Sequence, residues 1–179
     1  MQARKGTALQ PPNSSRRREP RASRPKIPAS YRIQRTRAGL LSWQSVRSRM
    51  RRSRNYWIGT LRPDGRPHVM PVWGVWVEDR LCFGTDRASR KARNLAATPA
   101  VVTHLESGDD VVIIEGVAAE ITDDAMLTKI DRAYFSKCKI HLIGYPADVM
   151  ICAIQPRVAF AWREKNFGRS ATRWRFHRE

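Results

Sequence analysis

The sequence predicts one mainly β domain with a few short helices, built as a small barrel or sandwich. From residue 55 onward, most segments alternate apolar and polar residues with a period of two, which is typical of strands. Turn sequences that contain Pro, Gly, Asp or Ser separate these segments. Only two segments after residue 55 have the period of a helix. About seven short strands with so few helices indicate a small barrel or sandwich.

Each expected hairpin has a turn whose residue types suit its geometry. Pro63-Asp64-Gly65 follows the first strand, Glu78-Asp79-Arg80 follows the second, and Ser107-Gly108-Asp109-Asp110 joins a later pair. The first three strands therefore form the start of a β-meander. In chain order, the expected strands are 55–62, 66–77, 81–85, 100–106, 111–121, 149–155, 157–162 and 171–176.

Three short helices are expected between and before these strands. One near residues 40–50 has a single apolar face, and arginines cover its other, solvated face. A longer one runs from about Asp123 to Lys137. Thr122 can cap it, and the two Asp residues that follow interact favourably with the helix dipole. The third is expected over 90–97, because Pro99 prevents its continuation.

Positive charge is concentrated at the N-terminus. Residues 1–54 hold 16 of the 34 Lys and Arg residues and only one of the 16 acids, Glu19, whereas the rest of the chain is nearly balanced. Residues 1–38 have almost no large apolar residues, so we expect a disordered basic tail there and a folded domain over 39–179. The tail is either a binder of nucleic acid or another polyanion, or a non-essential extension. Tyr31 is its one aromatic residue, so the tail gives no indication of base stacking.

Composition also limits the other classes of function. No segment reaches the roughly 18 apolar residues of a membrane span, and no apolar run follows the basic N-terminus as in a secretory signal. Cys82, Cys138 and Cys152 form no CxxC motif, which favours a reducing cytoplasm over a disulfide framework or zinc site. His68 and His104 have no second ligand at a suitable spacing, so no metal site is expected.

The helix expected over 90–97 breaks the charge rule that the longer helix follows. Ser89 is a good N-cap, but the first turn carries Arg90 and Lys91, and Arg87 lies just ahead. Cations at a helix N-terminus cost roughly 0.3–1 kcal/mol each. A bound phosphate would make the electrostatic contribution of these cations favourable. It would accept hydrogen bonds from the free backbone N–H groups and pair with the side chains. The segment Thr85–Leu95 is therefore either a phosphate site or a merely basic, exposed turn.

Several segments resemble motifs of the pyridoxamine 5'-phosphate oxidase-like family, and they occur in the family's order and spacing. The segment Asn55–Val69 is similar to the family's opening hairpin. The segments Phe83–Thr85 and Ser89–Leu95 are similar to its phosphate-binding loop. Together they cover about Leu40 to Phe176 of the chain. The segments that carry the resemblance are Asn55–Val69, Pro71–Trp73, Phe83–Thr85, Ser89–Leu95, Glu115–Ala118, Trp162 and Thr172–Phe176.

The resemblance implies a split β-barrel that works as a homodimer. It further implies that FMN or the related deazaflavin, coenzyme F420, lies in a cleft at the dimer interface. Arg90 and Lys91 would hold the cofactor phosphate with help from Thr85 and Ser89. The residues implied along the cofactor ring are Val69, Met70, Pro71 and Val72, and those implied to approach from the C-terminal region, across the dimer, are Trp162 and Arg173.

The chain departs from the true pyridoxamine phosphate oxidases near its C-terminal end. Those enzymes carry an Arg-Leu-His pattern that grips the substrate phosphate, whereas this chain has Ser170-Ala171-Thr172-Arg173. We therefore expect a flavin- or deazaflavin-dependent oxidoreductase that acts on another small molecule. The cofactor would carry the hydride, so no catalytic side chain is assigned. The alternatives are a non-catalytic protein that binds a flavin, haem or deazaflavin and, third, a polyanion or nucleic-acid binder that acts through the tail.

Overall fold

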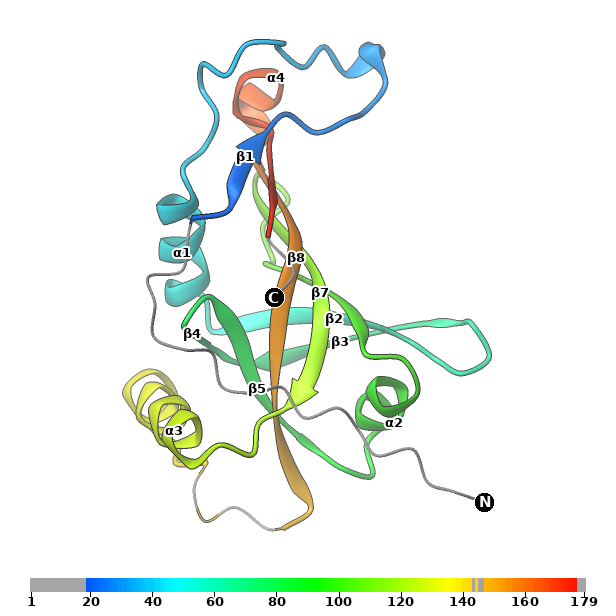
Figure 1. The fold of residues 1–179 in the computed structure, drawn as a ribbon, viewed down its shortest axis with the longest axis vertical. Helices are drawn as coiled ribbons and strands as arrows, with labels where there is room; N and C mark the ends of the chain where they lie inside the picture. Colours follow the sequence, from blue (N-terminus) through cyan, green and yellow to red (C-terminus); the bar gives the residue numbers. More distant parts are fainter. Residues whose placement is uncertain (1–18, 143, 145–146, 177–179) are drawn as a thin grey trace.

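The computed structural model describes residues 19–142, 144 and 147–176, and it is mainly antiparallel β with short helices, as the sequence predicts (Figure 1). Its strands are β1 (Arg21–Ser23), β2 (Asn55–Leu61), β3 (Pro67–Trp73), β4 (Val75–Val77), β5 (Arg80–Asp86), β6 (Ala100–His104), β7 (Asp110–Glu120), β8 (Val149–Arg163) and β9 (Thr172–Arg175). Its helices are α1 (Trp43–Arg52), α2 (Arg90–Ala97), α3 (Asp124–Cys138) and α4 (Phe167–Ser170), with 3-10 turns η1 (Ala29–Tyr31) and η2 (Glu164–Asn166).

The strands form one antiparallel sheet that is organised around β8. Its hydrogen-bonded order is β1-β9-β8-β7-β6-β2-β3, and β5 pairs with both β4 and β8. β7 follows one edge of β8 along nearly its whole length, while β5 takes the start of the other edge and β9 takes its end. Figure 1 shows β8 running through the middle of the molecule. The predicted fold class is confirmed, although the described strands do not close into a continuous hydrogen-bonded barrel.

Gly74 connects the two ends of the curved part of this sheet. The sequence predicts one strand over 66–77, but the structure has two, of which β3 pairs with β2 and β4 pairs with β5. These are the end strands of the path β4-β5-β8-β7-β6-β2-β3, so the chain itself closes the barrel at this corner. Glycine suits the corner because a Cβ would lie 2.8 Å from Leu81 Cδ1 and 3.0 Å from the carbonyl oxygen of Cys82.

β8 is one continuous strand, whereas the sequence predicts two strands with a break at residue 156. Pro156 has no N–H group for the ladder, and prolines usually interrupt central strands. Here β8 itself adapts by a bulge, because Glu115 pairs with Val158 and the next residue, Gly116, pairs with Pro156, which leaves Arg157 as the extra residue of β8. A Cβ on Gly116 would overlap the carbonyl oxygen of Gln155. The continuity of β8 therefore depends on a glycine opposite its proline.

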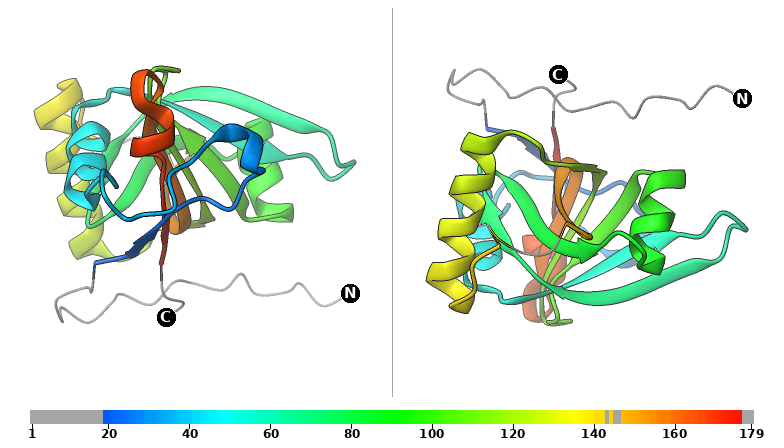
Figure 2. Two further views of the ribbon diagram at one scale, coloured as in Figure 1. Left: turned by 90° about the horizontal axis from the view of Figure 1, so that it is seen from above. Right: turned by 90° about the horizontal axis from the view of Figure 1, so that it is seen from below.

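The helices lie outside the sheet, and their caps explain where they begin. Figure 2 shows α1 and α3 on one side of the barrel and α2 on the other. α1 begins after Ser42, whose Oγ accepts the N–H of Ser45 at 3.2 Å. α2 spans the predicted residues 90–97. In α3, the prediction of Thr122 as the cap is wrong, because the Asp123 carboxylate accepts the N–H of Met126 at 2.8 Å and also carries the charge that the helix start favours.

Residues 19–38 pack against the C-terminal elements, although the sequence predicts disorder there. β1 pairs with β9, and the predicted domain boundary at residue 39 therefore falls inside the folded part. Arg24 fastens the segment by donating hydrogen bonds at 2.7–3.0 Å to the carbonyl oxygens of Thr36, Ala38, Arg169 and Ala171. Composition could not reveal these contacts, because they are made by backbone groups far away in the sequence. Residues 1–18 of the predicted tail lie outside the described residues.

Replacing Gly116 by alanine is expected to lower the free energy of unfolding by about 1–3 kcal/mol, the usual cost of overpacking. The new methyl group would meet the backbone of β8, which cannot move without breaking its hydrogen bonds. Urea denaturation followed by circular dichroism measures the change. The matched control is Gly108→Ala, because nothing lies within 4 Å of a Cβ at that position. Equal stability of the two variants would contradict the role assigned to Gly116.

Candidate functional site

The predicted phosphate loop links β5 to α2, and local hydrogen bonds fix its shape. Ser89 caps α2, since its Oγ accepts the N–H of Ala92 at 3.1 Å. The hydroxyl oxygens of Thr85 and Ser89 lie 3.0 Å apart. The first N–H groups of a helix have no partner within the helix. The loop therefore presents two hydroxyl groups beside free backbone donors, which is an arrangement suited to an anion.

Arg87 does not join the cation cluster that the sequence predicts at this helix start. Its guanidinium forms a two-pronged ion pair with Glu120 at the end of β7, and one of the two N–O distances is 3.2 Å. Hydrogen bonding to Glu120 raises the pKa of Arg87. The backbone N–H of Arg87 also donates to the carbonyl oxygen of Asp148 at 2.7 Å. Arg87 thus fastens the loop to β7 and to the segment before β8.

Arg90 and Lys91 are the cations that stay at the helix start. Arg90 is exposed, and among the described residues neither it nor Lys91 forms a salt bridge. The turn between β2 and β3 lies near this end of α2. Hydrogen bonds from Arg66 lower the pKa of Asp64 in that turn, and the charges of Arg62 and Arg90 add to the effect.

Lys91 is the more unusual of the two cations because its ammonium group is partly buried. The Nζ atom lies over the ring of Phe83, 5.2 Å from the ring centroid. Burial lowers the pKa of Lys91, since removal from water disfavours the charged form. The contact with the aromatic ring offsets only part of that cost. The start of α2 therefore holds a desolvated cation without an acidic partner among the described residues.

The segment predicted to line the cofactor ring lies on β3, next to β2, and is mostly exposed. Val69 and Met70 are 49% and 47% exposed, and Pro71 is exposed as well. Val72 differs because its side chain is buried in the main core. Only the first three of these four side chains are therefore available to a ligand.

A buried polar network, which sequence reasoning missed, connects α2 to the hairpin of β2 and β3. Asn94 is fully buried, and its Nδ2 donates to Thr60 Oγ1 at 2.9 Å. Thr60 Oγ1 in turn donates to the carbonyl oxygen of His68 at 3.2 Å and lies 3.4 Å from His68 Nδ1. The signal in the sequence was one polar residue between Ala92 and Leu95 on the buried face of α2. That signal cannot name the partner, which comes from a distant strand.

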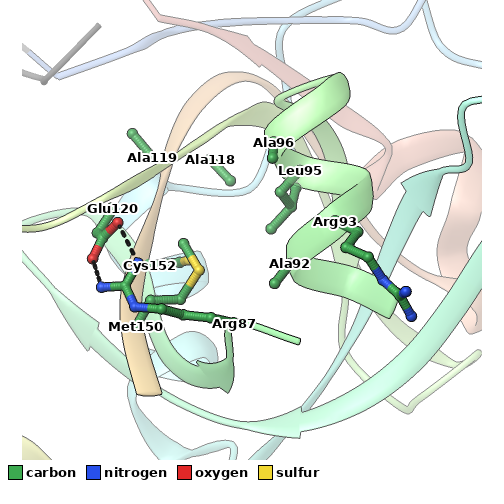
Figure 3. A pocket seen from close by; sticks show the side chains of 10 residues that line it. All are labelled: Arg87, Ala92, Arg93, Leu95, Ala96, Ala118, Ala119, Glu120, Met150 and Cys152. Atoms are coloured by element: carbon green, nitrogen blue, oxygen red, sulfur yellow. Dashed lines mark hydrogen bonds and ion pairs between the residues drawn. The ribbon is translucent and has the colours of Figure 1, made fainter. Parts of the chain in front are cut away.

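A cavity of about 350 Å³ lies between α2 and the strands β7 and β8. Figure 3 shows α2 on one side of it and the Arg87–Glu120 ion pair on the other. Cys152 lies at its wall, and burial raises the pKa of that thiol to about 12, so it is not a reactive thiolate at neutral pH. The apolar side chains around the cavity are those of Ala92, Leu95, Ala96, Ala118, Ala119 and Met150.

Trp162 and Arg173 lie at the opposite end of β8 from the phosphate loop. Thr85 pairs with Met150 near the start of β8, whereas Arg173 pairs with Phe160 near its end. Ten residues of strand between these pairs correspond to roughly 33 Å at about 3.3 Å per residue. One chain therefore does not bring Trp162 and Arg173 to its own phosphate loop.

The outer surface of β2, β3 and β6 is apolar and exposed. We call it the outer apolar face. Val69 and Val102 flank Gly59 in neighbouring strands on this face, and Val102 is 40% exposed. A contiguous exposed apolar surface of this kind is typical of an interaction site. The face is made up of Trp57, Leu61, Val69, Pro71, Trp73 and Val102.

Other types of site have little support in the part of the chain that the structure describes. No three or more His, Cys, Asp or Glu side chains there gather in a way that could hold a metal ion. None of the described helices is long and apolar enough to cross a bilayer. Cys82, Cys138 and Cys152 are all free thiols.

A family comparison matches residues 42–163 to the family described as pyridoxamine 5'-phosphate oxidase. The match runs from just before α1 to the end of β8, which is more than half of the chain. It includes the phosphate loop and β3, and it leaves out β1 and β9. No curated protein matches the sequence.

Solved structures share the fold at low sequence identity. A conserved hypothetical protein from Mycobacterium tuberculosis is 23% identical, with a TM-score of 0.62 over 72% of this chain and 88% of that chain. A pyridoxamine 5'-phosphate oxidase-related, FMN-binding protein from Nostoc punctiforme is 19% identical, with a TM-score of 0.52 over 76% and 89%. A haem storage protein from Vibrio cholerae is 18% identical, with a TM-score of 0.55 over 64% and 89%. Likeness at these identities shows a common fold and not a common ligand.

The variant Lys91→Met is expected to raise the midpoint of thermal unfolding of the ligand-free protein by a few degrees, because it removes a desolvated charge. The pKa of Lys91 is lowered in the folded state, so the unfolded state binds more protons between that lowered pKa and the ordinary value of 10.5. Wild-type stability should therefore rise with pH in that window relative to the variant.

Thermal unfolding at several pH values, followed by circular dichroism, checks both parts of this prediction. Lys165→Met is the matched control, because Lys165 is exposed. Lys137 also has a lowered pKa, but it is present in every variant, so its contribution cancels in the differences. If the Lys91→Met protein is less stable than the control variant, Lys91 is not a destabilising, desolvated cation.

Proposed function

The chain belongs to the pyridoxamine 5'-phosphate oxidase family, and on that premise we propose that it is an oxidoreductase that uses FMN or the deazaflavin coenzyme F420. The reaction would be hydride transfer to or from a small molecule. The observation that carries the proposal is the capped start of α2, where neither Arg90 nor Lys91 forms a salt bridge with any described residue. A cofactor phosphate supplies the negative charge that this end lacks.

The protein's own residues would bind and orient the cofactor. Thr85, Ser89 and the free N–H groups of α2 would donate to the phosphate, and Arg90 and Lys91 would pair with it. The cofactor ring would lie along β3 at Val69, Met70 and Pro71, which are all exposed, with Val69 and Pro71 on one face of the strand and Met70 on the other. The cofactor supplies the hydride chemistry when bound. This division of labour requires no acid–base pair on the protein.

A homodimer is part of the proposal because one chain cannot complete the site. Trp162 and Arg173 lie roughly 33 Å along β8 from the register of the phosphate loop, by the strand rise of about 3.3 Å per residue. A second copy, packed against the outer apolar face, would bring its own Trp162 and Arg173 towards the cofactor. Val69 belongs both to that face and to the proposed ring site. The interface and the cofactor site are therefore contiguous.

The C-terminal stretch that replaces the Arg-Leu-His pattern argues against pyridoxine phosphate as the substrate. Ser170 and Thr172 are buried, and their hydroxyl groups bond to the backbone of the same chain. Thr172 Oγ1 also accepts the N–H of Leu41 at 2.8 Å. Ala171 is fully buried. Only Arg173 of this stretch is partly exposed, so the stretch offers one cation where the true oxidases use two residues to grip a phosphate.

An oxidoreductase and a non-catalytic cofactor carrier differ in whether the bound cofactor can be reduced and reoxidised repeatedly. The absorption spectrum of the purified protein identifies a bound FMN, F420 or haem. The bound cofactor is then reduced and offered a series of small-molecule acceptors. Repeated cycling supports the oxidoreductase. A complex that no reductant or acceptor can cycle would instead identify a carrier.

The variants Arg90→Ala and Lys91→Ala are each expected to weaken FMN or F420 binding at least tenfold. Each removes a hydrogen bond between charged groups, worth about 1.5–3 kcal/mol, and tenfold in Kd corresponds to about 1.4 kcal/mol. Titration with each cofactor, followed by fluorescence, measures the effect. Arg93→Ala removes the same charge from the exposed surface of α2 beyond its first turn and serves as the control. Unchanged affinity in both test variants would refute the phosphate assignment.

The variant Val102→Asp is expected to convert the protein to a monomer and to weaken cofactor binding at least tenfold. A carboxylate at the centre of an apolar interface would be buried without a partner. Sedimentation velocity gives the oligomeric state, and cofactor titration gives the affinity. Phe135→Asp is the control, because Phe135 is 45% exposed on α3, away from the outer apolar face. A Val102→Asp dimer that keeps wild-type affinity would show that this face is not the interface.

A further inference from the structure

Asn94 is unusual among the residues of α2 because it is polar and yet has no exposed surface. Its Nδ2 donates to Thr60, but its Oδ1 has no hydrogen-bond partner among the described residues. A buried acceptor without a partner costs stability. An apolar residue would fill the same place at a lower cost, so the contribution of Asn94 must come from the directional bond to Thr60.

Thr60 receives that bond at a particular place in the sheet. It pairs with His68 across the β2–β3 ladder, one pair before Gly59 and Val69. Its hydroxyl donates onward to the carbonyl oxygen of His68 at 3.2 Å. The chain of hydrogen bonds therefore runs from α2 to the strand segment that begins the proposed ring site. Asn94 lies one turn after Arg90 and Lys91, so the same helix carries the proposed phosphate site.

The other side of α2 provides little constraint on its position. Ala92 and Ala96 lie about 200° around the helix from Asn94, because successive residues are about 100° apart. Both border the cavity of about 350 Å³ between α2 and the strands β7 and β8 (Figure 3). Close packing holds an element in place only where atoms meet. On that side, part of the helix surface faces this open pocket and is not packed against other side chains.

We propose that Asn94 and Thr60 are positioning residues that set the spacing between the phosphate site on α2 and the ring site on β3. This inference rests on the proposed function, because it assumes a cofactor that occupies both sites. Neither residue needs to touch the cofactor. The Asn94–Thr60 hydrogen bond fixes where the helix start stands relative to Val69 and Met70. A ligand that spans both sites gains from that fixed spacing, whereas a ligand that uses one site does not.

The test compares a cofactor with the same molecule lacking its phosphate. FMN and riboflavin form such a pair, and F420 is compared with its deazaflavin riboside, which lacks the phosphate together with the acidic tail attached to it. Whichever pair the wild-type protein binds is titrated against three variants. Thr60→Val keeps the shape of the side chain and removes the hydroxyl, Asn94→Leu removes the donor, and Thr60→Ser restores the hydroxyl as the matched control.

In Thr60→Val and Asn94→Leu, the affinity for the phosphorylated cofactor should fall at least tenfold. The affinity for the phosphate-free form should change less than threefold. Thr60→Ser should keep the wild-type ratio of the two affinities. A merely structural role would weaken both ligands in parallel, and that result would overturn the proposal, as would an unchanged ratio in Thr60→Val.

The outcomes also separate this inference from the proposed function. If the wild-type protein binds neither FMN nor F420, the proposed function itself is wrong. If it binds one of them and Arg90→Ala weakens that binding, the proposed site stands and the ratio in Thr60→Val decides the role of the network. Circular dichroism of each variant checks folding. Should Asn94→Leu fail to fold, Thr60→Val alone decides the result, since it keeps the volume of the buried side chain.

Discussion

The length of β8 is the constraint on which the rest of the structure depends. Its 15 residues give β5 and β9 separate places along one edge, while β7 covers the other. That continuity requires Gly116 on β7, because a side chain at this position would collide with the backbone of β8 beside Pro156. The same length keeps Trp162 and Arg173 far from the phosphate loop of their own chain. In the proposed site, Trp162 and Arg173 would therefore come from a second subunit.

The helices α2 and α3, which follow strands β5 and β7, carry opposite charges in their first turns, and the ligand is expected at α2. α3 begins with Asp123 as its cap and Asp124 in its first turn, in agreement with the helix dipole. α2 begins with two cations against the dipole. Arg87, which precedes the helix, is paired with Glu120, so it is not part of this imbalance. The cation that fastens the loop is therefore paired, whereas Arg90 and Lys91 at the helix start form no salt bridge among the described residues.

Local chemistry predicted most of the elements, and contacts between distant residues caused the errors. The bounds of α2 followed from Ser89 and the later proline, and the first hairpin followed from its turn. The break at Gly74 and the continuity across Pro156 could not be predicted, because each depends on a strand elsewhere in the sheet. The order of residues 19–38 depends on the carbonyl groups that surround Arg24. Within the site, the phosphate loop was visible in the sequence, whereas the Asn94 network was not, since its partner lies on β2.

Three features of α2 weaken the ligand-free fold. Lys91 is a partly buried ammonium without an acidic partner among the described residues, Asn94 has a buried acceptor without a donor, and the helix borders a cavity. Each of these lowers stability, and none helps the unliganded chain to fold. A ligand that binds only the folded state stabilises it by mass action. An anion at the start of α2 would also supply the charge that Lys91 lacks. A ligand bound at the start of α2 would therefore offset part of the cost of these features.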